Sequence, residues 1–381
     1  MADSIKILRV TTKLSIGGPT QHVALLSAGL KSHGFETVLA AGRVVPDEGD
    51  MEYFCATRGV PVVHIDELSR PMDLGKDIRA FFQILKLVWR EKPDILHTHL
   101  SKAGFMARLA ARILQLAGRR PLVIHTHHGH VFQIHYSESR RSRYRFLEKL
   151  AARWTDRLIA VSSLSRQELD IIHQIAKQEK FHTILPGLDL APFLETPRRT
   201  GAFRKKLGVD DKTVLIGVVG ALTAVKDHVL FLDAFKELLK KFPAAQAVIV
   251  GDGEEKGNLL AHAEKLGIAK LVHWPGFCVD IHEVYSDLDI LVQSSRSEGA
   301  PIPVIEAQAA GCPVVATAVG GTNEVMPEPP EKLKGRGEVS VREKTLSVRK
   351  GGFMVSRVSA ENVAKGCVEI LQGLQKIDPA L

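Results

Sequence analysis

The sequence predicts an α/β protein with two domains, each built on a parallel sheet that carries helices on both faces. Three observations support this prediction. The chain has 381 residues, more than a single hydrophobic core usually accommodates. Short apolar runs alternate with amphipathic helical segments, which is typical of parallel sheets. This alternation occurs twice along the chain, on either side of a join near residues 187–212.

The expected elements follow in chain order. A first strand at residues 5–10 leads through a glycine pair into a helix that reaches about His33. Further strands of the first series are expected at residues 37–40, 94–98, 121–126, 157–161 and 181–185. Strands of the second series are expected at residues 214–219, 247–250, 271–273, 290–292 and 314–316. The two domains are therefore residues 1–190 and 191–381. Open α/β sheets bind ligands at the carboxyl ends of their strands, so we expect a cleft between two such rows.

Composition and charge agree with a globular protein. The chain is 45% apolar and 25% charged, and no apolar run approaches the roughly 20 residues that a membrane-spanning helix needs. Its start enters a strand directly, without the apolar region of a signal peptide. Four cysteines lie far apart without a C-x-x-C, so neither a zinc site nor a disulfide framework is indicated. The net charge of +8 favours anionic partners, such as phosphates, nucleotides or an acidic membrane surface.

Residues 297–307 form the most informative segment of the chain. They follow an apolar strand and run through a Glu-Gly-x-Pro turn into a short helix that ends at Gly311. Glu298 lies in the turn and Glu306 inside the helix, eight residues later. The two carboxylates flank a helix N-terminus, whose free N–H groups suit a phosphate. Such an arrangement can hold a nucleotide diphosphate and fix sugar hydroxyls.

This segment resembles the E-x7-E signature of the retaining glycosyltransferases of family 4, also called group 1. Motifs similar to those of the family follow in the same order from Gly17 to about Glu369, nearly the whole chain. The resemblance implies the GT-B architecture, in which two Rossmann-like domains face each other across a cleft. It also implies a UDP- or GDP-linked sugar donor held mainly by the second domain and an acceptor held mainly by the first. Transfer would retain the anomeric configuration and need no metal.

Two glycine turns are candidates for contact with the diphosphate. Gly17 and Gly18 open the first helix, where backbone can approach a phosphate closely, although such a pair alone is more often only a tight turn. They do not form G-x-G-x-x-G, which counts against an NAD-binding fingerprint. In the second domain Gly220 and Lys226 join a strand to a helix, and Lys226 can neutralise a diphosphate. Ala221 stands where the family has an arginine, so either another arginine compensates or the protein is a poor catalyst.

The resemblance also implies the remaining donor contacts. Glu298 would hold hydroxyls of the donor sugar. Glu306 would bind the ribose hydroxyls, because its apolar neighbours indicate a buried helix and a buried carboxylate needs partners. Phe277 ends the segment where the family's main chain commonly meets the base. The other expected contacts are backbone positions, namely Gly251, Gly253, Gly299, Ala300 and Pro301.

Histidines are concentrated at two predicted strand ends. Seven of the 16 lie in one stretch, namely His97, His99, His125, His127, His128, His130 and His135. Histidines two residues apart on a strand share a face, so the metal site of a metallohydrolase is a rival interpretation. Against it, residues 121–135 contain no Asp or Glu, and hydrolytic sites generally mix carboxylates with histidines. The resemblance places His128 near the transferred sugar and leaves the other six as cleft lining or structural residues.

A metal is not expected from the carboxylates of the second domain either. Asp287 and Asp289 have the D-x-D form that metal-dependent sugar transferases use. They stand at the start of a strand after an amphipathic turn, so we interpret them as structural. No cofactor is expected beyond the nucleotide-sugar co-substrate.

A basic segment suggests the nature of the acceptor. Residues 140–157 combine six arginines and a lysine with Phe146, Leu147, Leu150 and Trp154, as in a helix that lies on an anionic membrane. A solvated basic face over an ordinary core helix is about as common. We expect a lipid-linked or membrane-proximal acceptor in polysaccharide or cell-envelope glycan synthesis, and no nucleic-acid partner. The expected location is the cytoplasm, either free or peripheral at the inner face of the membrane.

Three other functions stay open. The chain can be a GT-B nucleotide-sugar epimerase, a weakly active or non-catalytic nucleotide-sugar-binding protein, or the metallohydrolase mentioned above. Residues 326–350 are strongly charged and rich in Pro and Gly, so we expect a surface insertion or flap there. The chain also ends soon after a helix expected near residues 360–375, where the family usually continues with a further helical segment.

Overall fold

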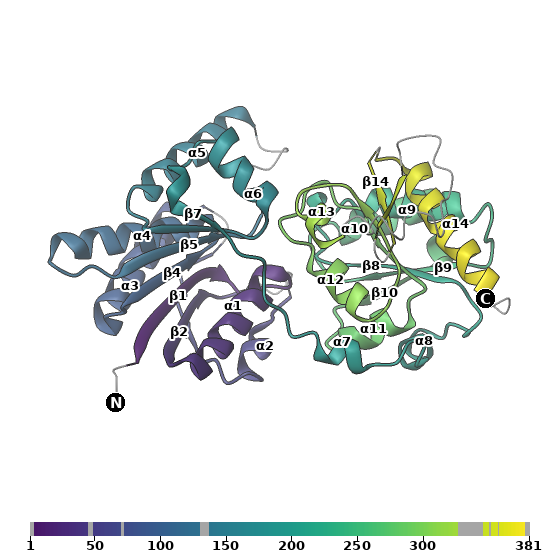
Figure 1. Ribbon diagram of the computed structural model, residues 1–381, viewed down its shortest axis with the longest axis horizontal. Helices are drawn as coiled ribbons and strands as arrows, with labels where there is room; N and C mark the ends of the chain where they lie inside the picture. The colour runs from purple at the N-terminus through teal and green to yellow at the C-terminus, as the bar shows by residue number, and fades with distance from the viewer. Residues whose placement is uncertain are drawn as a thin grey trace, which may run out of the picture. The chain divides into compact units, whose positions relative to one another are not determined.

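The protein forms two compact units in a computed structural model. The structure describes residues 4–44, 49–69, 72–129, 137–326, 346–349, 352–356 and 358–377. The units are Met1–Leu188 and Asp189–Leu381, a division within two residues of the one expected from the sequence. Each unit is built on a seven-stranded sheet with helices on both faces (Figure 1).

The sheet of the first unit is parallel throughout, in the order β3-β2-β1-β4-β5-β6-β7. Its strands are β1 (Ile5–Lys13), β2 (Phe35–Gly42), β3 (Val62–His64), β4 (Ile95–His99), β5 (Leu122–His127), β6 (Arg157–Ala160) and β7 (Phe181–Thr183). The order reverses between β1 and β4, and ligands of open α/β sheets bind at such a switch point. Strand β3 was not predicted, because this edge strand of three half-buried residues is too short to show a periodic pattern.

The helices of the first unit pack on both faces of this sheet. They are α1 (Gly18–Gly29), α2 (Glu52–Ala56), α3 (Leu74–Glu91), α4 (Ser101–Leu116), α5 (Glu138–Ala152) and α6 (Ser163–Gln167). Alternate residues of a strand face opposite sides. In β2, accordingly, Ala40 joins the core under α3 and α4, whereas Leu39 and Ala41 join the core under α1. Asp73 starts α3 by accepting a hydrogen bond from the backbone N–H of Lys76 at 3.0 Å.

The sheet of the second unit has the order β10-β9-β8-β11-β12-β14-β13, and only β13 runs antiparallel to its neighbour. Its strands are β8 (Leu215–Val219), β9 (Gln246–Val250), β10 (Val272–Gly276), β11 (Ile290–Gln293), β12 (Val314–Thr317), β13 (Leu346–Arg349) and β14 (Gly352–Val355). The β13–β14 pair corrects one expectation, because residues 346–349 belong to the stretch interpreted as an insertion or flap. Residues 327–345 and 350 of that stretch lie outside the described residues.

The helices of the second unit are α7 (Ala191–Glu195), α8 (Ala202–Leu207), α9 (His228–Leu238), α10 (Lys256–Lys265), α11 (Ile281–Asp287), α12 (Ile302–Ala309), α13 (Thr322–Val325) and α14 (Ala360–Ile377). One core packs α9, α10 and α14 on the sheet, and a second core packs α11 and α12 on its other face. Strand β8 contributes side chains to both cores, because alternate residues face opposite sides of the sheet. Ile216 and Val218 lie in the first core, and Leu215 and Val219 lie in the second. This arrangement directs the loops after β8, β9, β11 and β12 to the carboxyl edge of the sheet.

The D-x-D carboxylates are structural, as interpreted from the sequence. Asp287 is buried, and its carboxylate accepts the backbone N–H groups of Gly201 and Phe203, both at 2.8 Å, at the start of α8. Asp289 is also buried, and it pairs with the buried Arg204 at 2.9 Å. Protein donors therefore surround both carboxylates, which tie α8 to β11.

Candidate functional site

Glu298 is the centre of a polar cluster in the second unit. It lies in the turn between β11 and α12 and is only 6% exposed. Lys226 ends a single 3-10 turn after β8, 72 residues earlier, and its Nζ lies 2.7 Å from Oε1 of Glu298. Ser295 donates to the same oxygen at 2.6 Å, and Gln293 donates to it as well. Among the described residues these donors all bind Oε1, so Oε2 is the oxygen that can receive a ligand hydroxyl.

The loop after β12 holds the Glu298 turn in place. The backbone N–H of Gly321 donates to the carbonyl oxygen of Glu298 at 3.1 Å. A Cβ atom on Gly320 would lie 1.8 Å from that carbonyl oxygen, and its φ of +50° also favours glycine. Only glycine lets this loop approach closely enough to fix the main chain at Glu298.

Glu306 lies in α12 and is 5% exposed, so the expected burial of this carboxylate is confirmed. The hydroxyl of Tyr285 in α11 donates to its Oε2 at 2.9 Å. Burial, together with the charge of Glu306, raises the pKa of Tyr285 well above its usual value, so this hydroxyl stays a donor. The protein therefore supplies a partner to Glu306 that the sequence did not reveal.

The start of α12 offers fewer phosphate donors than expected. Gly299 and Ala300 lie in the turn, and Pro301 is the capping residue without a side-chain hydrogen bond to the helix. Pro303 stands in the first turn of the helix and has no N–H. Backbone binding of an anion here depends on Ile302 and on the turn before it.

Glycines allow the loops after β8 and β9 to pack backbone to backbone. A Cβ on Gly251 would lie 2.0 Å from the carbonyl oxygen of Gly220, and a Cβ on Gly253 would lie 2.6 Å from that of Leu222. The N–H of Gly251 also donates to the carbonyl of Gly276 at the end of β10, at 2.9 Å. The structure thus brings Gly220, Gly251 and Gly253 together, and Phe277 follows β10 beside them. This loop packing requires the glycines whether or not a nucleotide binds.

A second cation lies near the lysine turn. Arg296 is two residues before Glu298, and its backbone N–H donates to the carbonyl of Val225 at 2.9 Å. Its side chain donates to Asp227 at 2.7 Å, and this hydrogen bond raises the pKa of Arg296. The guanidinium is therefore held one residue from Lys226, on the loop where Ala221 replaces the family arginine.

In the first unit His128 belongs to a cluster of imidazoles. Its Nε2 lies 2.9 Å from Nδ1 of His99 at the end of β4, and its ring centroid is 5.1 Å from that of His22 in α1. His22 comes from the helix that Gly17 caps with a φ of +143°, a conformation that favours glycine. The structure therefore brings the Gly17-Gly18 helix and His128 together. His130 and His135 lie outside the described residues.

Buried histidines in both units are neutral at physiological pH. Burial, with a smaller contribution from the Arg9 cation, lowers the pKa of His22 to about 4. Burial, with a contribution from Lys226, also lowers the pKa of His228 to about 4. His228 begins α9, and both of its buried ring nitrogens lack a hydrogen-bond partner among the described residues.

We expect the free energy of unfolding to fall as the pH drops from 6.5 toward 4. Each of these two imidazoles stays neutral in the folded chain over this range, whereas the unfolded chain takes up a proton with a pKa of about 6.5. The stability lost at pH 5 is about 2 kcal/mol for each histidine, and almost none is lost at about pH 8. Urea unfolding of the wild type and of His228→Leu, at pH 5 and at about pH 8, measures this loss of stability. His228→Leu should lose less unfolding free energy on acidification than the wild type. Replacement of the exposed His182 by leucine should leave the loss as large as in the wild type. Equal losses in all three proteins would contradict the prediction.

The basic segment forms α5 and the turn after it. Phe146 is 67% exposed, and Arg140, Arg143 and Arg153 are exposed as well. Leu150 and Trp154 are partly buried, as on the inner side of an ordinary surface helix. One large apolar side chain thus stands among arginines on the outer side of α5. No helix in the described part of the chain has the length and apolar character to cross a membrane.

Three residues that bind the two site carboxylates were not predicted from the sequence. Gln293 and Ser295 contact Glu298, and Tyr285 contacts Glu306. Gln293 and Ser295 directly follow the apolar run of β11, and polar residues at the carboxyl end of a buried strand are a general signal for a ligand site. Tyr285 gave no such signal, because its contact with Glu306 joins two helices.

Comparisons with known proteins agree with this arrangement. Residues 16–192 match the family described as Glycosyltransferase Family 4, and residues 200–328 match the family described as Glycosyl transferases group 1. One relative is the UDP-Gal:alpha-D-GlcNAc-diphosphoundecaprenol alpha-1,3-galactosyltransferase of Escherichia coli. It is 31% identical over 293 residues, which make up 74% of this chain and 74% of that protein.

Solved structures share the fold at low sequence identity. HepE of Anabaena, in complex with UDP-glucose, matches with a TM-score of 0.76 at 20% identity, over 98% of this chain and 91% of that one. WaaG, a glycosyltransferase involved in lipopolysaccharide biosynthesis, matches with a TM-score of 0.69 at 16% identity, over 99% of this chain and 93% of that one. This chain therefore belongs to the group 1, or family 4, glycosyltransferases and has the GT-B fold.

Proposed function

We propose that this protein transfers a sugar from a UDP-sugar to a lipid-linked acceptor, with retention of the anomeric configuration and without a metal in the transfer step. The observation that carries the proposal is the Lys226–Glu298 contact at the carboxyl edge of the second sheet. It combines a cation for a leaving diphosphate with a carboxylate for sugar hydroxyls. Nucleotide diphosphates leave with negative charge, and fixed positive groups stabilise that charge in the transition state.

Each site residue has one role in the proposed reaction. The bond between the anomeric carbon and the diphosphate oxygen breaks while an acceptor hydroxyl attacks from the same face, and the hydroxyl proton passes to the departing diphosphate oxygen. Lys226 stabilises the diphosphate and Glu298 orients the sugar through its hydroxyls. Glu306 binds the ribose, with Tyr285 fixing the carboxylate. His128, on the first unit, contacts the transferred sugar as a neutral imidazole, because burial lowers its pKa.

The identity of donor and acceptor is supported by the relatives. The Escherichia coli relative is named for UDP-Gal and for a diphosphoundecaprenol-linked acceptor, and HepE was solved with UDP-glucose. For this chain they favour UDP over GDP and a polyprenyl-diphosphate acceptor in envelope glycan synthesis. The exposed Phe146 and the arginines of α5 suit an anionic membrane that carries such an acceptor. Co-sedimentation with anionic vesicles tests this surface, and equal pelleting with neutral vesicles would exclude it.

A thermal-shift screen with UDP-, GDP- and ADP-sugars tests the donor assignment. We expect a UDP-sugar to raise the melting temperature and calorimetry to give a dissociation constant for it. Glu306→Ala should weaken that affinity about tenfold or more, since a buried carboxylate then no longer holds the ribose. Because Tyr285 also loses its partner in this variant, Tyr285→Phe, which keeps the carboxylate but removes its hydrogen bond, measures that share of the loss and should weaken the affinity less than Glu306→Ala. Undiminished affinity in Glu306→Ala would remove the ribose assignment.

Ala221 favours a second candidate, a weakly active or non-catalytic nucleotide-sugar-binding protein. Its side chain brings no charge to the loop after β8, and Arg296 is the cation that can take over. If Arg296 compensates, Arg296→Ala should lower turnover of the donor and Ala221→Arg in the same chain should restore it. Tight donor binding without turnover in the wild type, gained only with Ala221→Arg, would instead favour the non-catalytic function.

A further inference from the structure

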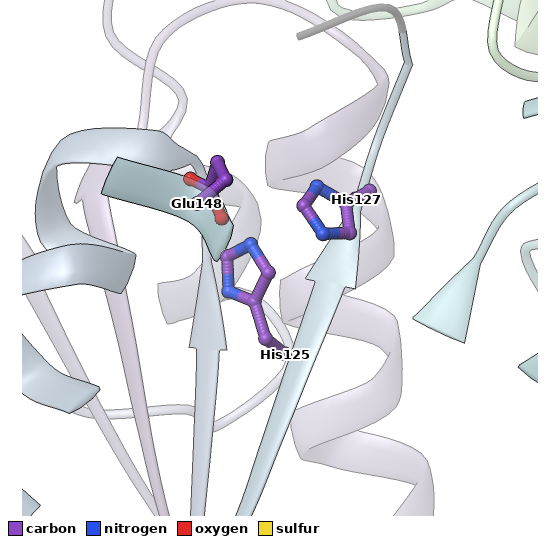
Figure 2. Close-up of side chains that lie close together, drawn as sticks. All are labelled: His125, His127 and Glu148. Carbon is purple, nitrogen blue, oxygen red and sulfur yellow. The ribbon is translucent and has the colours of Figure 1, made fainter. Parts of the chain in front are cut away.

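A second polar cluster lies in the first unit and shares no residue with the Lys226–Glu298 site. His125 and His127 stand two residues apart on β5, so they point to the same face. Glu148 comes to that face from α5, and Figure 2 shows the carboxylate and the two imidazoles converging. Potential ligand atoms of all three residues lie within 4.8 Å of one another. Each of the three side chains is buried.

The sequence could not reveal this convergence. Residues 121–135 contain no Asp or Glu, which counted against a metal there. The structure supplies the carboxylate from outside that stretch, because α5 packs back toward β5 through α4. The resulting set of two imidazoles and one carboxylate is one that divalent zinc-like ions accept.

Neighbouring groups hold His125 in the orientation that a metal ligand needs. The hydroxyl of Thr98 donates to the carbonyl of Ile124, and its oxygen lies 2.8 Å from Nδ1 of His125. When the Thr98 hydroxyl donates to Ile124, its oxygen accepts from Nδ1 of His125, and the lone pair of His125 is then on Nε2, free for a metal. Such a second hydrogen bond fixes the tautomer of metal-binding histidines in general. Gly104 in α4 leaves room for the imidazole ring, because a Cβ atom at that position would lie 2.6 Å from Cε1 of His125.

Glu148 is held in the same way. Arg108 of α4 donates from Nη2 to Oε2 of Glu148 at 2.8 Å, and its Nε donates to the carbonyl of Gly104 at 2.9 Å. Arg108 thus engages one carboxylate oxygen, and the carboxylate carries a second. This contact orients the carboxylate, but the positive charge of Arg108 also weakens the attraction of the site for a cation.

His127 supplies the independent sign of a missing ligand. Its Nε2 is buried and has no hydrogen-bond partner among the described residues. An unpaired buried nitrogen of this kind costs about 1–3 kcal/mol. Unlike His228, His127 has two further potential metal ligands close by, in His125 and Glu148. A metal ion coordinated by that nitrogen would remove this cost.

From this geometry we infer that His125, His127 and Glu148 bind one divalent transition-metal ion of the zinc type. Water takes the fourth position, as in zinc sites with three protein ligands. Mg²⁺ and Ca²⁺ are poor occupants, because they prefer oxygen ligands. The ion links α5 to the end of β5, next to His128. The inference does not depend on the proposed transfer reaction, to which this ion contributes no step.

Metal binding by the whole 381-residue chain tests the inference. The protein is first stripped with a chelator and desalted. Titration of this protein with Zn²⁺ in a calorimeter, and elemental analysis after reloading and removal of excess metal, should each find one Zn²⁺ per chain. Co²⁺ should give the visible absorption of a tetrahedral site, which Zn²⁺ abolishes, and Mg²⁺ should not compete. Wild-type protein that binds no stoichiometric Zn²⁺ and gives no Co²⁺ absorption would overturn the inference without any variant.

Variants locate the ion. His127→Gln removes one ligand and should weaken Zn²⁺ binding by about tenfold or more. The matched control is His182→Gln on β7, an exposed histidine that should leave the affinity unchanged. Glu148→Gln is a less suitable first choice, because it leaves the buried Arg108 without its carboxylate. Circular dichroism confirms that His127→Gln is folded, and undiminished Zn²⁺ affinity in the folded variant would assign the ion to other residues.

Discussion

Replacing Lys226 with alanine is expected to lower kcat about 100- to 1000-fold with the matching UDP-sugar, while KM changes much less. Lys226 lies 2.7 Å from Glu298, so its charge is fixed before a donor arrives. Charge grows on the diphosphate only as the bond to the sugar breaks, so a fixed cation stabilises the transition state more than the ground state. The size of the effect follows from removals of single groups that stabilise a developing anion. Steady-state kinetics measure the loss of kcat, and an unchanged melting temperature shows that the variant is folded.

The matched control is Lys206→Ala. Lys206 also pairs with a glutamate at 2.7 Å, but on the surface of the unit, where Glu283 is its partner. Kinetics should not change in this variant. A loss confined to KM in Lys226→Ala would mean that Lys226 binds the donor without stabilising its departure. Unchanged kcat and KM would remove Lys226 from the site.

Glu298→Gln separates the two members of the pair. The amide keeps the shape of the side chain but loses the charge that holds Lys226 and the capacity to accept hydrogen bonds at both terminal atoms. We expect this variant to lose turnover with the donor while UDP alone still binds, because the proposed contact is with the sugar. Equal loss of UDP affinity would place Glu298 at the nucleotide instead.

The fold was predictable from the sequence because parallel strands buried on both faces are apolar throughout. Strands such as β8 and β11 stand out for that reason, and the repetition of the strand–helix alternation on either side of a join indicated two units. Edge elements carry less of this signal. The short β3 has only half-buried residues, and β13 lies in a charged stretch, so neither was predicted.

The site was predictable where one short segment carries several of its members. Glu298, Glu306 and the turn between them occupy a single stretch, and the burial of Glu306 followed from its apolar neighbours. Contacts that join distant segments could not be derived in this way. Lys226 was found through resemblance alone, and Glu148 was missed because only the packing of α5 brings it to β5.

Asp289→Asn should destabilise the second unit by about 3–5 kcal/mol, because it leaves the buried Arg204 without its countercharge. Arg204 also donates to main-chain carbonyls, which hold it in place and prevent it from reaching water. A metal-binding D-x-D motif would behave differently, since replacing a metal ligand abolishes activity but relieves repulsion between carboxylates. Urea unfolding and hydrogen exchange in peptides of β8 and β11 measure the loss. Glu283→Gln, which breaks the exposed pair with Lys206, is the control and should cost less than about 1 kcal/mol. Full stability of Asp289→Asn together with lost turnover would overturn the structural assignment and reopen a role for metal in the transfer.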